Sequence, residues 1–506
     1  MSEAVQIGKF TLESLTTGMY EQPLIVYREY LQNAADSLES AQRTGIVDEK
    51  TMLVQIRVST DERMIEIRDN GEGIPEDLAP SILMSVGKSP KLHTESRGFR
   101  GIGRLGGISY CDRLEFETST MGSDKAVLVS FDCVLLKQLL RPGENADMSM
   151  AEVIEKVCHQ EVKEVAVEDH YFSVRMLDVD ERTNLLDAAK VKSYLGQIAP
   201  VTYSPNFKMI SDHIYTFLRE NNVNLTEFPV QVVFDSEFPR PLVKPCSRRY
   251  YAGRGKEQDQ EIIYEIEKFI IKSHEQKTLA LGWYAKGEWK GTITDPNIRG
   301  LRIRMGNIQI GNEDTLDFVF KQPRFNGWCQ GEIFAVSDEL IPNARRDNFE
   351  QNSAYFELIE GLKPIADKIY KELTEASKAR NDPATKTVES GKEVVSKVVE
   401  QKNKGFNSHT EAETAVIQVE SALSKLKKTV AKKPEIEQKK VEVIEQLQGI
   451  LDDMEDVTPY KRDRLKGVLG KKEMKIFNLA TDIMTEYLDE DFLNVIVDKM
   501  IDEILK

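Results

Sequence analysis

The sequence contains few of the residues that stabilise secreted proteins. Among its 506 residues there are only five cysteines and six histidines. The cysteines are odd in number and far apart, with no pair at metal-ligand spacing: Cys111, Cys133, Cys158, Cys246 and Cys329. We therefore expect reduced thiols rather than a disulfide framework or a zinc site.

Signals for secretion and for membrane insertion are lacking too. The first ten residues, MSEAVQIGKF, have neither the basic start nor the apolar stretch of a signal peptide. No apolar run approaches the roughly 18–20 residues that a membrane-spanning helix needs. The sequence predicts a cytoplasmic protein that makes no membrane contact.

An excess of positive charge is also absent. The formal net charge is −16, which argues against bulk attraction to nucleic acids or anionic membranes. The length exceeds what one hydrophobic core supports, so we expect about three domains.

The first region, residues 1–182, mixes helical and strand patterns. Residues 11–41 are predicted to be helical, with apolar side chains at helical spacing. Residues 54–60, 64–70 and 113–120 alternate between apolar and polar, as half-buried strands do. This order predicts an α+β fold, a sandwich with helices on one face of a sheet.

Three further regions follow. Residues 186–375 are predicted to form a second α/β domain, beginning with a helix. Residues 376–411 are polar and nearly free of aromatic residues, so they are predicted to form a linker or a loosely helical spacer. Residues 412–506 have two apolar stripes at helical spacing and an apolar final helix. This helical module either binds a second copy or a partner, or packs only on itself.

The first chemical motif is REYLQNAADSLES, residues 28–40. Glu29, Asn33 and Asp36 follow one another at i, i+4 and i+7, which places them on one narrow stripe of a helix. A solvated face is the alternative, but an asparagine in mid-helix lowers helix propensity. An acid can deprotonate a water, and an amide oxygen can ligate Mg²⁺.

The second motif is IRDNGEGIPEDL, residues 67–78. A predicted strand ends at Asp69, and Gly71 and Gly73 then turn the chain. Asp-Asn-Gly is also an ordinary turn signal. A carboxylate at a strand end can accept a hydrogen bond from an exocyclic amine such as that of adenine.

The third motif is RGFRGIGRLGG, residues 97–107. Gly98, Gly101 and Gly103 form the pattern G-x-x-G-x-G, whose backbone N–H groups can surround phosphate. The spacing differs from that of a P-loop. The preceding segment contains glycine, serine and Lys88, which is the composition of a lid.

Together, E-x-x-x-N-x-x-D, D-x-G-x-G and G-x-x-G-x-G, in this order, resemble the Bergerat (GHKL) ATP-binding fold of gyrase, 90-kDa heat-shock chaperones, histidine kinases, MutL and MORC proteins. The resemblance implies ATP and Mg²⁺ as ligands. It implies Glu29 as general base, Asn33 as Mg²⁺ ligand and Asp69 as the carboxylate that recognises adenine. The other residues expected to bind nucleotide are Asp36, Gly71, Gly73, Lys88, Gly98, Gly101 and Gly103.

The second region is similar to the middle domain of the chaperone branch, a transducer-like domain. RGLRIRMGNIQIGNED and SDELIPNARRDNFEQ carry this similarity. It implies that Arg346, beside Asn343, reaches the γ-phosphate, although Arg345 is adjacent and could take the role. The family's Gly-Thr pair, whose threonine touches the nucleotide, is absent: the matching strand reads HYFSVRML, so that contact is either missing or made by Ser173.

The leading hypothesis is a slow ATP hydrolase of the chaperone-like branch, working as a homodimeric clamp on a protein client. A nucleic-acid clamp like MutL or MORC is the alternative, supported by Arg248, Arg249 and Arg254 but opposed by the acidic total charge. A third possibility is a nucleotide-gated regulatory or defence component that acts on a protein partner.

Overall fold

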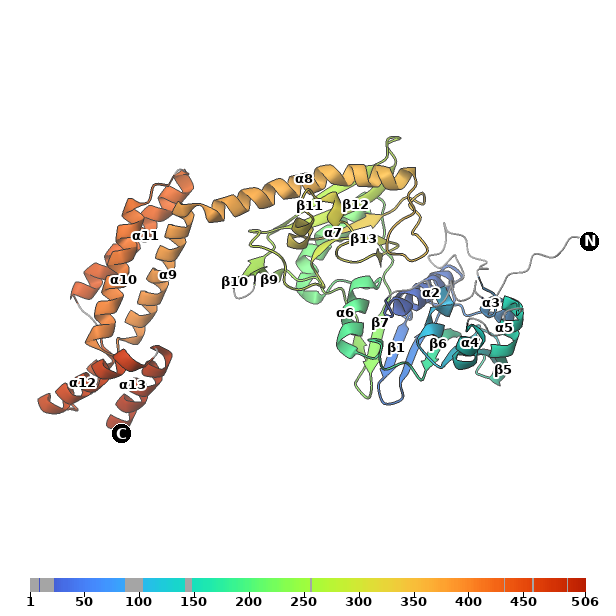
Figure 1. Cartoon of the computed structure of the whole chain (residues 1–506), viewed down its shortest axis with the longest axis horizontal. Helices are drawn as coiled ribbons and strands as arrows, with labels where there is room; N and C mark the ends of the chain where they lie inside the picture. The colour runs from blue at the N-terminus through green and yellow to red at the C-terminus, as the bar shows by residue number, and fades with distance from the viewer. Residues whose placement is uncertain are drawn as a thin grey trace, which may run out of the picture. The chain divides into compact units, whose positions relative to one another are not determined.

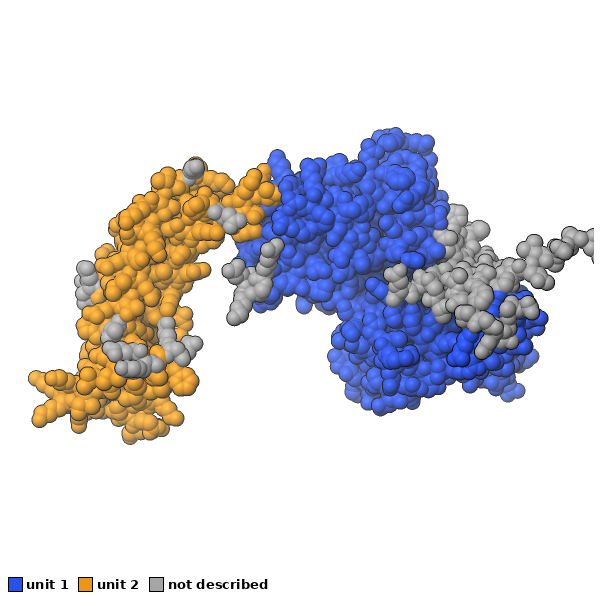
Figure 2. Space-filling model, in the orientation of Figure 1, with its two compact units in different colours: residues 1–373 blue, residues 374–506 orange. Residues whose placement is uncertain are grey.

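The computed structural model describes residues 9, 22–86, 103–141, 148–254, 257–431, 433–456, 459–488 and 490–506. The chain divides into two compact units, Met1–Leu373 and Thr374–Lys506 (Figure 2). The fold is α+β, as predicted, with two main sheets in the first unit and helices in the second (Figure 1).

The first helix within the described residues, α2 (Ile25–Arg43), carries the polar stripe predicted from the sequence. Its apolar side chains recur at helical spacing, and Tyr27, Leu31 and Leu38 are at most 1% exposed. Burial of this face fixes α2 against the sheet, because most helical stability comes from such packing. The helix ends before Gly45, whose φ of 75° no longer fits a right-handed helix.

Eight strands form the first sheet, in the order β5-β4-β3-β6-β2-β1-β7-β8. Only the β1–β7 pair is parallel. The strand bounds are β1 (Val54–Ser59), β2 (Met64–Asp69), β3 (Arg113–Ser119), β4 (Lys125–Asp132), β5 (Cys158–Glu164), β6 (Tyr171–Leu177), β7 (Val230–Phe234) and β8 (Arg240–Pro241). The three strands predicted from alternation, β1, β2 and β3, are confirmed. The strands β7 and β8 extend this sheet although they lie in the predicted second region.

The two faces of the first sheet differ in chemistry. Ile67, Phe116 and Val174 belong to the apolar core that also contains the buried face of α2. On the opposite face, Arg175 lies 3.1 Å from Glu115 and 2.9 Å from Glu117. One face therefore supports α2 and the other is a charged surface.

Short elements complete the first region: α3 (Ala79–Leu83), η1 (Gly103–Ser109), α4 (Cys133–Leu139) and α5 (Met150–Val157). The chain then enters α6 (Ala188–Ile198), η2 (Pro205–Phe207) and α7 (Lys208–Glu220). The helix predicted at the start of the second region is α6.

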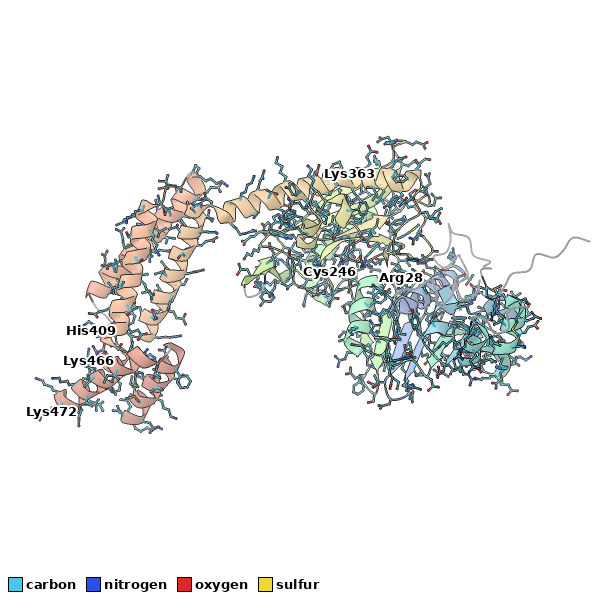
Figure 3. The ribbon with its side chains drawn as sticks, viewed as in Figure 1. Arg28, Cys246, Lys363, His409, Lys466 and Lys472 are labelled. Carbon is cyan, nitrogen blue, oxygen red and sulfur yellow. The ribbon has the colours of Figure 1, made fainter. Side chains whose placement is uncertain are left out.

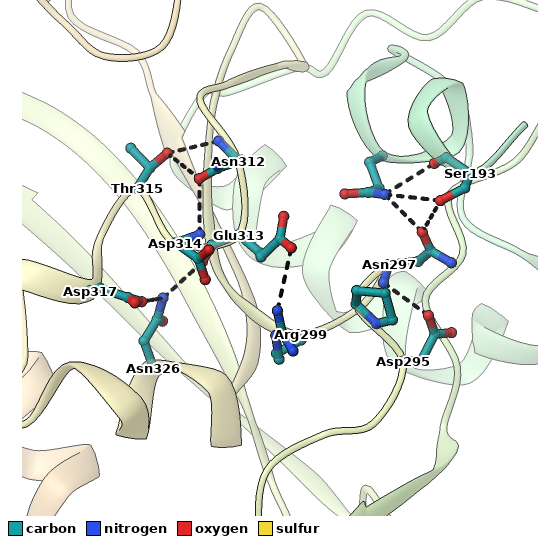
Figure 4. Close-up of polar contacts among 12 residues, drawn as sticks. Ser193, Asp295, Asn297, Arg299, Asn312, Glu313, Asp314, Thr315, Asp317 and Asn326 are labelled. Carbon is teal, nitrogen blue, oxygen red and sulfur yellow. Dashed lines mark hydrogen bonds and ion pairs between the residues drawn. The ribbon is translucent and has the colours of Figure 1, made fainter. Parts of the chain in front are cut away.

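The second main sheet has the strand order β11-β12-β15-β13-β14. Its strands are β11 (Glu265–Lys272), β12 (Thr278–Lys286), β13 (Gly300–Met305), β14 (Ile308–Ile310) and β15 (Gln330–Ala335). A hairpin of β9 (Arg249–Arg254) and β10 (Glu257–Ile262) precedes it. The turns η3 (Asp317–Val319) and η4 (Pro323–Trp328) lie before β15, and Asn326 joins them by donating to Asp317 at 2.7 Å (Figure 4).

A buried ionic cluster joins the second sheet to the chain before it. Glu332 on β15 pairs with Arg304 and lies 3.6 Å from Lys244, and Tyr203 donates a hydrogen bond to it. Burial alone would raise the pKa of Glu332, but the positive charges of Arg304 and Lys244 lower it to about 2. Burial also lowers the pKa of Lys244 to about 8.

We predict that Glu332→Gln lowers the free energy of unfolding by about 3–5 kcal/mol, because it leaves buried charges without their partner. Urea denaturation measures this. Glu339→Gln, at an exposed carboxylate 3.7 Å from Lys277, is the control and should change stability by less than about 0.5 kcal/mol.

The pH dependence of this prediction has a definite sign. The folded-state pKa of Glu332 lies below its ordinary value, so its stabilisation is present above pH 4.5 and is lost as the pH falls toward 2. The gap in stability between wild type and Glu332→Gln should narrow over that interval. A gap that stays constant down to pH 2 would contradict the assignment.

The second unit is built from helices. The long helix α8 (Ser353–Asn381) ends inside it. It is followed by α9 (Pro383–Lys404), α10 (His409–Lys428), α11 (Pro434–Asp456), η5 (Lys461–Leu465), α12 (Lys471–Tyr487) and α13 (Glu490–Ile504). None of the helices in the described ranges combines the length and apolar character that a membrane crossing requires.

Residues 376–411, predicted to form a linker or a loosely helical spacer, lie largely in the helices α8, α9 and α10. Val388 and Val398 on α9 are at most 3% exposed and share a core with α10 and α11. These few apolar residues suffice because α9 buries only one stripe. The two apolar stripes predicted in residues 412–506 lie on α10 and α11, where Val419 and Val443 are at most 1% exposed. Val430, which helical spacing placed at the end of the first stripe, lies beyond the end of α10 and is 81% exposed.

Candidate active site

The polar stripe of α2 lies on the helix face that the sequence predicts. Glu29 and Asp36 are 7% and 6% exposed, and Asn33 is half-buried. A carboxylate this deeply buried loses hydration, so it needs compensating groups or a function. The turn after β2, the start of η1 and the loop that carries Arg346 provide the neighbouring groups.

The turn after β2 lies directly against α2. Asp69 is 2% exposed and accepts a hydrogen bond from the Gly71 N–H at 2.9 Å. A β-carbon at Gly71 would overlap the Ser37 side chain on α2, so only glycine fits there. Gly73 has a φ of 71°, and a side chain on it would overlap the Ser119 carbonyl. Gly71 therefore lets the Asp69 turn approach α2, and Gly73 lets the same turn approach β3.

The start of η1 contacts Glu29, the residue predicted to be the general base. Gly103 touches Glu29 so closely that a β-carbon would overlap the Glu29 Oε2 atom. Further along η1, the Gly107 N–H donates to the Tyr30 hydroxyl at 3.0 Å. One end of the glycine-rich motif is thus fixed on α2 beside the predicted base. Lys88, Gly98 and Gly101 lie outside the described residues.

Arg104 ties η1 to the segment that follows α3. Its guanidinium donates to the Ser85 carbonyl, and burial lowers its pKa to about 10. This contact joins the two described ends that flank residues 87–102. Sequence reasoning did not identify Arg104 as part of the site.

Ser173 does not lie beside the other predicted nucleotide contacts. Its hydroxyl donates to Glu66 at 2.8 Å, and Ser173 is paired with Arg68, whereas Asp69 is paired with Phe172. Successive residues of a strand point to opposite faces, so Ser173 lies on the charged face of the sheet. The expected contact between Ser173 and nucleotide therefore does not fit this geometry.

Thr118 on β3 lies on the same face of the sheet as Asp69, which is opposite to the face of Ser173. It is also paired with Phe172, and its hydroxyl accepts from the Ile74 N–H at 2.8 Å. Thr118 therefore fixes the turn that contains Gly73. The alternation of residues 113–120 predicted the strand, but only the register shows which face Thr118 occupies.

The loop that carries Arg346 contacts α2. Arg346 is 6% exposed, and its Nε lies 3.8 Å from Glu29 Oε1. Arg346 has a φ of 55°, and Arg345 is exposed. The structure thus brings Glu29 and Arg346 together, although they are far apart in the sequence, and leaves Arg345 outside the contact with Glu29.

Arg28 holds this loop in place. It lies where α2 faces the part of the first unit that carries the second sheet (Figure 3). Its guanidinium donates to the carbonyls of Arg346, at 3.0 Å, and Arg345, at 2.6 Å. Its Nε is 4.0 Å from Glu29 Oε1. No local pattern predicts this role, because Arg28 immediately precedes the E-x-x-x-N-x-x-D pattern that begins at Glu29.

Comparison with known families decides the class of this site. The family described as histidine kinase-, DNA gyrase B- and HSP90-like ATPase matches residues 23–161. Residues 23–161 are a GHKL-type ATPase domain. No curated protein matches the chain. The GHKL ATPase domain implies binding and hydrolysis of ATP, and it contains Glu29, Asn33, Asp69 and Gly103 but not Arg346.

The GHKL ATPase domain fits ATP and Mg²⁺ on structural grounds. Among the described residues, no group of three or more histidine, cysteine or acidic side chains could hold a metal by itself. Mg²⁺ would instead be held by Asn33 together with phosphate oxygens of the substrate, and when bound it would neutralise phosphate charge. Gly71 and Gly103 let the backbone approach Asp69 and Glu29 closely, because a β-carbon at either position would overlap these carboxylates.

We predict that Gly103→Ala lowers the turnover of the GHKL ATPase domain by about tenfold to 100-fold. The new methyl group would displace the Glu29 carboxylate, and misplacing a catalytic group by about 1 Å can lower the rate 100-fold. ATP hydrolysis by the full chain measures the effect. Gly449→Ala, where a β-carbon meets no atom within 4 Å, is the control. Equal losses in both variants would contradict the role of Gly103.

Proposed function

We propose that this protein is an ATP-driven molecular clamp of the chaperone-like branch, in which Glu29 is the general base and Arg346 contacts the γ-phosphate of ATP. The observation that carries the proposal is the 3.8 Å approach of Arg346 Nε to Glu29 Oε1. Arg346 comes from outside the GHKL ATPase domain. Because the site is complete only when the Arg346 loop is docked, hydrolysis depends on the position of that loop.

The two oxygens of Glu29 have different surroundings. Oε2 faces Gly103, and Oε1 faces Arg28 and Arg346. Oε2 is therefore on the side of the glycine-rich motif, where the phosphates of ATP would bind. It would take a proton from the attacking water, and the resulting hydroxide would displace ADP from the γ-phosphorus.

Arg346 supplies positive charge to the same reaction. A guanidinium stabilises the negative charge on the transferring phosphoryl group, but only when the loop is docked. Arg28 supports docking because it binds two consecutive carbonyls of that loop. Because turnover depends on this arrangement, we expect it to be slow.

We further propose a homodimer that acts on a protein client. Apolar side chains on α12 support an interface between copies: Ile476, Leu479 and Ile483 are 69%, 62% and 51% exposed, and their i, i+3, i+7 spacing places them on one stripe. The β9–β10 hairpin does not favour nucleic acid, since Arg249 lies in a strand paired with one that contains Asp259 and Glu261.

The test has two parts, both on the full-length protein. The first is Mg²⁺-dependent release of phosphate from ATP. The second attaches a fluorophore pair at Asp61→Cys, an exposed site, and follows energy transfer between protomers with a non-hydrolysable ATP analogue. Turnover together with a nucleotide-dependent change in transfer supports a clamp. Turnover without any change would leave an ATPase that is not a dimeric clamp.

A further inference from the structure

The Asp69 turn, residues 69–74, begins at the end of β2, which lies between β1 and β6 in the first sheet. Asn70 fixes the turn on the side of β1. Its side chain accepts a hydrogen bond from the Leu53 N–H at 2.7 Å and donates one to the Thr51 carbonyl at 2.8 Å. Gly71, the next residue, has no side chain, so its backbone has to be held by groups from elsewhere in the chain.

His170 holds Gly71 from the side of β6. The His170 Nδ1 atom lies 2.9 Å from the Gly71 carbonyl oxygen. Because a carbonyl oxygen can only accept, Nδ1 carries the hydrogen and donates it. The register of the sheet explains the contact: Asp69 is paired with Phe172 in the antiparallel β2–β6 ladder, so Gly71, two residues further on, lies opposite His170.

The chain before β6 is fixed as well, so His170 does not reach the turn from a loose end. The Val165 N–H donates to the Asp124 carbonyl at 3.0 Å, and the Gly122 N–H donates to the Val167 carbonyl at 2.7 Å. These bonds attach the segment to the turn between β3 and β4. His170 also lies beyond residue 161, where the family match ends.

Gly71 connects His170 to Asp69. Its N–H donates to Asp69 Oδ1 at 2.9 Å, and its carbonyl accepts from His170. The two bonds fix the peptide groups on both sides of the Gly71 α-carbon, where a glycine would otherwise have more conformational freedom than any other residue. A bulkier residue cannot supply this rigidity, because a β-carbon here would overlap Ser37 and Asp69.

We propose that His170 is a positioning residue that sets the affinity of the site for the adenine base. By holding the Gly71 carbonyl, it keeps the Gly71 N–H on Asp69 and so keeps the Asp69 carboxylate directed at the exocyclic amine of adenine. The proposal rests on the proposed function, in particular on Asp69 as the residue that recognises adenine. It makes base recognition depend on a residue outside the segment that the family model matches.

The role of a positioning residue differs from a purely structural one in its dependence on the base. A carboxylate can only accept a hydrogen bond, so Asp69 gains affinity from a base that presents an amine. A purine that lacks this amine gains nothing from a well-directed carboxylate. Loss of His170 should therefore weaken binding of ATP and have little effect on a nucleotide without the amine, whereas general damage to the site would weaken both.

The test measures equilibrium binding to the full-length protein of ATP and of purine riboside triphosphate, which lacks only the exocyclic amine. His170→Ala should weaken ATP binding about three- to tenfold, as expected for a lost hydrogen bond. Binding of purine riboside triphosphate should change by less than about twofold, and kcat at saturating ATP should stay within about twofold. An unchanged preference for ATP, or equal weakening of both nucleotides, would overturn the proposal.

His170→Asn supplies a rescue, because the asparagine amide nitrogen is separated from the α-carbon by as many bonds as histidine Nδ1. It can donate to the Gly71 carbonyl, so this variant should keep the wild-type preference for ATP within about twofold. A preference as low as that of His170→Ala would contradict the role of the Nδ1 donor. His159→Ala, at an exposed histidine on β5, is the matched control and should leave both affinities unchanged.

The wild-type protein separates failure of this proposal from failure of the proposed function. Equal binding of ATP and purine riboside triphosphate by the wild type would refute Asp69 as the adenine-recognising residue, and the His170 proposal with it. A wild-type preference for ATP that persists in His170→Ala would refute only the role of His170. A preference for ATP without any ATP hydrolysis would refute the proposed hydrolysis and leave the role of His170 to be decided by the variants.

Discussion

Glu29→Gln should reduce ATP hydrolysis by about 10²–10⁴-fold while ATP still binds. Glutamine has the size of glutamate but cannot accept a proton, and loss of a general base lowers the rate by this amount. Binding should persist because Asp69, the residue expected to recognise adenine, lies at the end of β2 and is untouched. Mg²⁺-dependent phosphate release and equilibrium binding of labelled ATP measure the two properties separately.

The control for this variant is Glu62→Gln. The Glu62 side chain is 60% exposed and lies 3.7 Å from Arg57, away from the polar stripe of α2. The ATP turnover of the Glu62→Gln variant should equal that of the wild type. Should Glu29→Gln also retain full turnover, Glu29 is not the base, and the site must activate water by another group.

Arg346→Ala should lower kcat by about 10³-fold, which is the lower end of the effect of an arginine that stabilises a transferring phosphoryl group. The loss should appear in kcat more than in ATP binding, because the charge is needed most in the transition state. Alanine keeps the β-carbon, so the left-handed backbone at this position, with φ of 55°, is equally strained in both proteins. Single-turnover kinetics isolates the chemical step.

Arg345→Ala is the matched control, since the two arginines are adjacent and only one is buried. Arg345 is exposed and donates no group to Glu29 in the structure, so its removal should change kcat by no more than about threefold. The reverse pattern, with Arg345→Ala inactive and Arg346→Ala active, would assign the phosphate contact to Arg345.

The parts of the site that the sequence predicted are those that depend on local spacing. The stripe of Glu29, Asn33 and Asp36 follows from the helical period, and the turn at Gly71 follows from glycine chemistry. The strand pattern around Ser173 predicts alternation but not which set of residues faces the helix. That choice depends on the register between β6, β2 and β3, which is not encoded within HYFSVRML itself.

Contacts between distant segments were not predictable in this way. Arg28 binds carbonyls more than 300 positions away, and no local pattern marks an arginine for that task. The pairing of β7 with β1 and the packing of α9 against α10 and α11 were not predictable for the same reason. Each depends on a partner surface that the segment's own composition does not describe. The Arg346 loop was found through family resemblance rather than through spacing.

The order of strands in the first sheet limits where the ATPase domain can be separated from the rest of the chain. The family match ends at residue 161, but β6, the strand between β3 and β2, begins at Tyr171. A fragment cut at residue 161 would lack the middle of its sheet and expose two unpaired strand edges, which promote aggregation. A fragment cut at residue 182 would restore β6 and still leave β1 without β7. The segment that the family model matches is therefore smaller than the sheet to which it belongs, and we expect limited proteolysis to release no stable piece that ends before β8.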